Sequence, residues 1–183
     1  MMVNKKQIPN IITLLRLVLI PFFIFFAVQE HYFASLLIFV IAALSDTIDG
    51  FIARKYNLVS SFGKLFDPLA DKILAASALI IISCWGFISW WIVALILARD
   101  VIMTFLRHFL TKKQIYLASN FGGKLKTTLQ FIAIIFVLFY KTFLPELEIV
   151  KFIILIMFVV IAILTWLSAI IYFSQIKRKK YVK

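Results

Sequence analysis

Four aspartates lie close together in a chain that is otherwise strongly apolar: Asp46, Asp49, Asp67 and Asp71. A charged side chain costs about 2.5 kcal/mol or more at the centre of a bilayer, so four of them in apolar segments require a chemical reason. Carboxylate oxygens are the ligands that hard divalent cations such as Mg²⁺ or Mn²⁺ prefer. Two such ions about 4 Å apart would hold a phosphoryl group during its transfer. The four acids therefore predict a two-metal site for phosphoryl transfer.

The acids have helical spacing on two neighbouring segments. The first two are three residues apart and the last two are four apart, so each pair shares one face of a helix. If the helices are joined by a turn near residues 55–62, all four carboxylates converge within about 15 Å of the helix ends on one side. The alternative is an ion-pair network that only joins the two helices. Arg54 is the one cation in register with these acids. A single positive charge compensates four negative charges poorly, which argues against a purely structural ion-pair network.

The elements that carry these acids are predicted to cross a membrane. The chain has 183 residues and is 64% hydrophobic, which indicates an integral membrane protein with a single domain over residues 1–183. Apolar stretches long enough to span a bilayer as helices occur at about 11–28, 32–54, 65–86, 88–110, 121–142 and 149–174. We therefore expect an all-α, polytopic membrane protein with six transmembrane helices, preceded by a short interfacial segment at residues 3–10.

Basic residues set the orientation of these helices. With six crossings, every Lys and Arg except Lys141 and Lys151 falls on the side of the two termini, which the positive-inside rule makes cytoplasmic. The net charge of +12 is spread along this face, so it indicates contact with anionic lipids, not a nucleic-acid partner. Cys84 is the single cysteine and is predicted to be a small apolar core residue. The sequence thus predicts a multi-pass protein of the inner (cytoplasmic) membrane with its site open to the cytoplasm.

The acidic segment resembles the signature of the CDP-alcohol phosphotransferase family, D-x2-D-G-x2-A-R-x8-G-x3-D-x3-D. All of its fixed positions are filled, by Asp46, Asp49, Gly50, Ala53, Arg54, Gly63, Asp67 and Asp71. The resemblance implies a six-helix enzyme, usually a homodimer, that joins a CDP-activated group to an alcohol. It further implies that the four aspartates bind the metal ions and that Asp71 is the general base for the acceptor hydroxyl. The residues implied near the CDP moiety are Asp49, Gly50, Arg54 and Gly63.

Segments outside the signature bear on the acceptor alcohol. Ile8–Arg16, Arg99–Asp100, Arg107 and Gly123–Gln130 are similar to bacterial family members that use glycerol 3-phosphate. This implies transfer of the phosphatidyl group of CDP-diacylglycerol to glycerol 3-phosphate. The cations expected to bind the acceptor's phosphate are Arg107, Lys124 and Lys126, with Arg16 and Arg99 as weaker candidates. The alternative for these cations is ordinary basic flanking of helix ends.

Two other functions fit parts of the pattern. A family member with another acceptor would use phosphatidylglycerol (in cardiolipin synthesis), inositol phosphate or serine. A divalent-cation transporter would use the intramembrane acids as its ion path, but it has no need of Gly63 and Arg54 in register. Release of CMP distinguishes the enzyme from the transporter.

Overall fold

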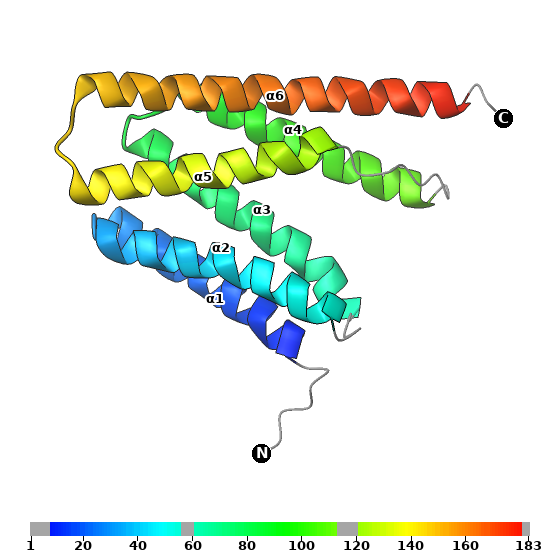
Figure 1. Cartoon of the computed structure of the whole chain (residues 1–183), viewed down its shortest axis with the longest axis horizontal. Helices are drawn as coiled ribbons and strands as arrows, with labels where there is room; N and C mark the ends of the chain where they lie inside the picture. Colours follow the sequence, from blue (N-terminus) through cyan, green and yellow to red (C-terminus); the bar gives the residue numbers. More distant parts are fainter. Residues whose placement is uncertain (1–7, 56–60, 113–120, 181–183) are drawn as a thin grey trace, which may run out of the picture. The chain divides into compact units, whose positions relative to one another are not determined.

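The computed structural model describes residues 8–55, 61–112 and 121–180, with side chains at 14–45, 68–106, 109–110 and 125–174. Its elements are α1 (Ile8–Val28), α2 (Tyr32–Lys55), α3 (Ser61–Cys84), α4 (Trp90–Lys112), α5 (Phe121–Phe143) and α6 (Glu148–Lys180) (Figure 1). All regular structure in these ranges is helical, which confirms the predicted all-α class and the six helices.

Two helix ends differ from the prediction. The helix α1 begins at Ile8, three residues before the predicted span at 11–28, so it includes residues 8–10 of the expected interfacial segment. Pro9 is compatible with this start because the first turn of a helix leaves its N–H groups without intrahelical acceptors. The rest of the expected segment lies outside the described residues. The helix α6 continues to Lys180, past the predicted end at residue 174, because Lys and Arg are good helix formers.

The turn between α1 and α2 matches the predicted range of residues 29–31. Glu30 has a φ of 60°, a left-handed conformation that reverses the chain, and the N–H of His31 donates to the carbonyl of Phe26 at 2.9 Å. The turn before α4 contains Gly86 at a φ of 80°, which glycine adopts without the steric cost of a Cβ. The short connection at residues 29–31 makes α1 and α2 antiparallel.

The chain forms two compact units, of which the first contains residues 1–81 and 134–145. Here α1 packs against α2. Phe23 and Phe39 are fully buried at this interface, with ring centroids 5.4 Å apart. At the turn end of α2, the ammonium of Lys141 lies 5.1 Å from the ring centroid of Tyr32. This unit carries all four aspartates of the signature.

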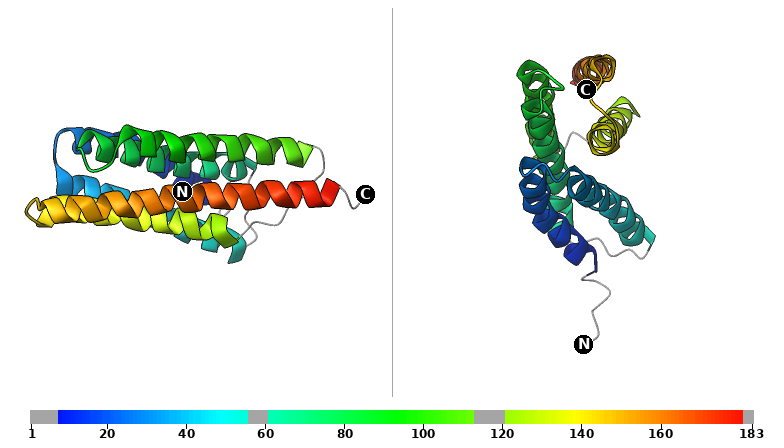
Figure 2. Two further views of the ribbon diagram at one scale, coloured as in Figure 1. Left: turned by 90° about the horizontal axis from the view of Figure 1, so that it is seen from above. Right: turned by 90° about the vertical axis from the view of Figure 1, so that its left-hand side faces the viewer.

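The second unit contains residues 82–133 and 146–183. In it α4 packs against α6 (Figure 2). An apolar cluster formed by Met103, Leu110, Ala169 and Tyr172 joins the two helices, and Leu106 packs against it. Among the buried polar side chains of this unit, Arg99, Lys126 and Ser168 belong to the cluster described below, whereas Ser83 donates to the carbonyl of Ile88 in the turn before α4.

Large apolar side chains are exposed along every helix. On α6 the exposed residues include Ile149, Phe152, Ile156, Ile163 and Ile170. Exposed apolar surface of this extent indicates contact with lipid. Among the described residues, Leu125–Phe143 and Glu148–Ser174 are long and apolar enough to cross a membrane. That all six helices cross it stays a prediction.

Candidate functional site

All four signature aspartates lie on helices, as the spacing predicts. Asp46 and Asp49 belong to α2, and Asp67 and Asp71 belong to α3. Pro68 lies between the last two without ending α3, although it removes one helix hydrogen bond. Among these four aspartates, the side chain of Asp71 is the one that the structure describes. Those outside the described side chains are Asp46, Asp49, Asp67, Gly50, Arg54 and Gly63, so their convergence stays a prediction.

Asp71 is paired with an arginine from another helix. The Arg16 guanidinium on α1 donates through Nη1 to Oδ1 of Asp71 at 2.7 Å. The Arg16 side chain is 0% exposed, whereas that of Asp71 is 33% exposed. A buried guanidinium thus compensates the charge of the carboxylate and fixes its direction, while the carboxylate keeps an accessible edge. Sequence reasoning placed Arg16 with the acceptor's phosphate, but in this structure it contacts Asp71.

The described part of the chain gives no complete metal centre. No group of three or more His, Cys, Asp or Glu side chains is close enough to hold an ion among the described side chains, which include one of the four aspartates. The donor set itself fits Mg²⁺ or Mn²⁺, because it consists of carboxylate oxygens with no sulfur or imidazole. Asp71, with its accessible and oriented carboxylate, is suited to join such a set.

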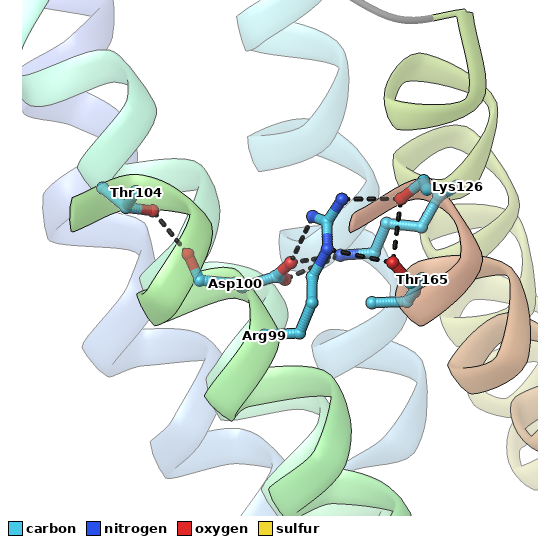
Figure 3. A network of polar contacts seen from close by, with 6 residues as sticks. Arg99, Asp100, Thr104, Lys126 and Thr165 are labelled. Carbon is cyan, nitrogen blue, oxygen red and sulfur yellow. Dashed lines mark hydrogen bonds and ion pairs between the residues drawn. The ribbon is translucent and has the colours of Figure 1, made fainter. Parts of the chain in front are cut away.

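A second polar cluster lies in the other unit, around Asp100 on α4 (Figure 3). Lys126 on α5 contacts both oxygens of the Asp100 carboxylate, at 2.6 Å to Oδ1 and 2.7 Å to Oδ2. Arg99 donates through Nη1 to Oδ1 of the same carboxylate at 3.1 Å. One carboxylate therefore bridges two cations, and both cations are buried.

Arg99 is also anchored to α6. Its Nε donates to the carbonyl of Thr165 at 3.0 Å, and its Nη2 donates to the hydroxyl of Ser168 at 2.6 Å. The Ser168 hydroxyl in turn donates to the Thr165 carbonyl at 2.8 Å. These contacts connect α4 to α6 through a guanidinium each of whose three nitrogens donates a hydrogen bond (Figure 3). Arg99 thus holds two helices together and orients Asp100.

These contacts bear on the predicted acceptor residues. Lys126 lies in the cluster, and Arg99, a weaker candidate for binding the acceptor's phosphate, is paired with Asp100. The side chains of Arg107 and Lys124 lie outside the described ones, so their role stays a prediction. Sequence reasoning missed Thr165 and Ser168. Two polar residues three apart in an apolar helix were a usable signal, since such residues usually form hydrogen bonds between membrane helices.

We expect Ser168→Ala to destabilise the protein by about 1–3 kcal/mol, because it leaves a buried guanidinium donor without its acceptor. The measurement is the midpoint of thermal unfolding in detergent. Ser174→Ala is a matched control on the same helix, since its hydroxyl makes the same 2.8 Å bond to the carbonyl three residues earlier but is exposed. Equal midpoints for the two variants would contradict the role given to Arg99.

Comparison with known proteins identifies the family. The sequence profile of CDP-alcohol phosphatidyltransferases matches residues 6–174. The chain belongs to this family. The match confirms the resemblance seen in the acidic signature.

Individual relatives cover most of the chain. It is 36% identical over 176 residues to a protein of Shigella flexneri serotype 5b (strain 8401), covering 92% of this chain and 93% of the relative. It is 39% identical over 140 residues to a protein of Escherichia coli (strain K12), covering 72% of this chain and 76% of the relative. Both relatives are named CDP-diacylglycerol–glycerol-3-phosphate 3-phosphatidyltransferase.

Proposed function

We propose that this chain transfers the phosphatidyl group of CDP-diacylglycerol to sn-glycerol 3-phosphate, giving phosphatidylglycerophosphate and CMP. The observation that supports this most is the 36% identity, over 92% of the chain, to a relative named for that reaction. The complete acidic signature on α2 and α3 supports the phosphoryl-transfer step. The glycerol 3-phosphate acceptor fits the cationic residues at the cytoplasmic ends of α4 and α5.

In this proposal the four aspartates hold two divalent ions. Bound Mg²⁺ or Mn²⁺ supplies charge neutralisation of the diphosphate and of the developing leaving group. The ligands are Asp46, Asp49, Asp67 and Asp71, whose carboxylates would otherwise repel one another. Asp49, Gly50, Arg54 and Gly63 contact the CDP moiety. Arg54 suits this role because a guanidinium matches two phosphate oxygens at once.

Asp71 takes the proton from the acceptor. Its carboxylate accepts the hydrogen of the glycerol 3-phosphate hydroxyl, and the oxygen attacks the phosphorus that carries the diacylglycerol group. The bond from that phosphorus to the bridging oxygen breaks, and CMP leaves with this oxygen. Arg16 is a positioning residue in this step, since its 2.7 Å contact fixes the direction of the Asp71 carboxylate. Positioning and charge stabilisation supply most of the catalysis in such transfers.

The acceptor's phosphate is bound by Arg107, Lys124 and Lys126. Lys126 is the one whose surroundings the structure describes. Its contacts with both oxygens of Asp100 support this role, because two phosphate oxygens can accept the same pair of bonds from its ammonium. The site faces the cytoplasm, because nearly all basic residues lie on the side of the termini. We place the enzyme in the inner membrane, surrounded by lipid, and expect a homodimer by analogy with the family.

Lys124→Gln is expected to lower kcat/KM for glycerol 3-phosphate by about 10- to 100-fold, because a charge-assisted hydrogen bond contributes about 1.5–3 kcal/mol. The KM for CDP-diacylglycerol should hardly change. The measurement is initial-rate kinetics with each substrate varied in turn. Lys141→Gln, at the other end of the same helix, is the control and should behave as the wild type. A defect confined to CDP-diacylglycerol would refute the assignment.

Acceptor choice is tested by CMP release from CDP-diacylglycerol with purified protein. Glycerol 3-phosphate, phosphatidylglycerol, inositol phosphate and serine are offered one at a time at equal concentration. We expect glycerol 3-phosphate to support release and the other three to give the rate without acceptor. A higher rate with another acceptor would reassign the enzyme within its family.

A further inference from the structure

The cluster around Asp100 has an unusual order of exposure. The Asp100 side chain is 20% exposed, whereas that of Arg99 is 9% exposed and that of Lys126 is 4% exposed. The accessible member is thus the carboxylate, and the two cations lie behind it. An anion that approaches this cluster meets a negative charge first.

The two cations are held in different ways. Arg99 is fixed on α6 by its bonds to Thr165 and Ser168, and these bonds do not depend on Asp100. Lys126 contacts Asp100 with a single ammonium group that bridges both carboxylate oxygens at 2.6 and 2.7 Å. Two oxygens of a phosphate would make the same pair of contacts with that ammonium. The carboxylate therefore occupies the position that an anionic ligand of Lys126 would take.

We propose that Asp100 is a specificity-determining residue: its carboxylate is the resident counter-ion of Lys126, and the acceptor's phosphate replaces it on binding. This inference rests on the proposed function, because it takes Lys126 as a phosphate-binding residue. A phosphate monoester carries nearly two negative charges, so it competes with a single carboxylate better than a neutral alcohol or a singly charged acid does. The exchange therefore favours acceptors that carry a phosphate.

The test uses the isosteric variant Asp100→Asn in the full-length protein in detergent. The probes are inorganic phosphate and glycerol 3-phosphate, and binding is measured by titration calorimetry without CDP-diacylglycerol. We expect the Kd of both anions to fall about tenfold, because a buried ammonium that loses its counter-ion attracts another anion. Asp100→Glu keeps the negative charge, so its Kd for each anion should stay within about threefold of the wild-type value. A loss of packing alone would not make an anion bind more tightly.

Two comparisons separate a local exchange from a general change in charge. Glu146→Gln removes an acid from another ion pair, with Lys151 at 3.2 Å, and should leave both Kd values unchanged. In a Lys126→Gln background, Asp100→Asn should no longer tighten phosphate binding. Unchanged or weaker binding by Asp100→Asn would overturn the proposal. So would an equal gain in Glu146→Gln or in the Lys126→Gln background.

The stability of Asp100→Asn is informative as well. Inorganic phosphate should raise its thermal midpoint more than that of the wild type, because the anion restores the charge balance of the cluster. An equal rise of the thermal midpoint in both proteins would overturn the proposal that phosphate replaces the Asp100 carboxylate. So would a variant that cannot be recovered folded even in phosphate. Because binding is measured without turnover, its result is independent of CMP release. An inactive wild type would instead reject the proposed function.

Discussion

Removal of divalent cations is expected to abolish CMP release, and added Mg²⁺ or Mn²⁺ should restore it. In the proposed site, removal of the cations would leave four carboxylates opposite the diphosphate of the donor, with the Arg16 guanidinium compensating one of them. The loss amounts to several kcal/mol of charge stabilisation, which corresponds to a rate decrease on the order of 1000-fold or more. The measurement is CMP release after treatment with EDTA, followed by titration with each metal.

The control for this experiment is EDTA already saturated with Mg²⁺, which exposes the protein to the chelator without removing the ion. This control should leave the rate unchanged. Full turnover by protein that has been stripped of metal would reject the role given to the four aspartates.

Asp71→Asn is expected to abolish measurable transfer while the fold and CDP-diacylglycerol binding persist. The amide keeps the shape of the side chain and can still accept the hydrogen bond from Arg16, but it cannot take the acceptor's proton. Loss of a general base costs about 100- to 10,000-fold in rate, and the weaker metal ligand adds to this. The measurements are kcat from CMP release and the Kd for CDP-diacylglycerol.

Glu30→Gln makes the same acid-to-amide change in the turn between α1 and α2 and should retain the wild-type rate. Near-normal turnover of Asp71→Asn would show that another group accepts the proton. Loss of CDP-diacylglycerol binding in this variant would instead assign Asp71 to the binding of the donor.

The helices and the turn at residues 29–31 could be predicted because they depend on local properties. An apolar run of about 20 residues is read directly from the sequence, and so are the breaks between runs. The ends of α1 and α6 were missed by a few residues, since Pro9 and the basic residues after position 174 are compatible with both helix and coil. Helix boundaries are set by such weak preferences.

The polar partners were predictable only in part. The pairing of Arg16 with Asp71 joins residues 55 positions apart, and spacing along one helix gives no information about which residue of another helix lies opposite. Adjacent helical residues point to different sectors of a helix, but the side chain of Arg99 is long enough for its guanidinium to contact the neighbouring Asp100 carboxylate. Intramembrane charge indicated that partners exist, and only packing shows which ones they are.

Transfer of the phosphatidyl group to glycerol 3-phosphate is tested by identifying the lipid that the purified protein makes. CDP-diacylglycerol and labelled glycerol 3-phosphate are supplied with Mg²⁺, and the lipid extract is separated by thin-layer chromatography and analysed by mass spectrometry. We expect a labelled phosphatidylglycerophosphate, formed in an amount equal to that of CMP. CMP release without a labelled lipid, or a lipid product only with serine, inositol phosphate or phosphatidylglycerol, would contradict it.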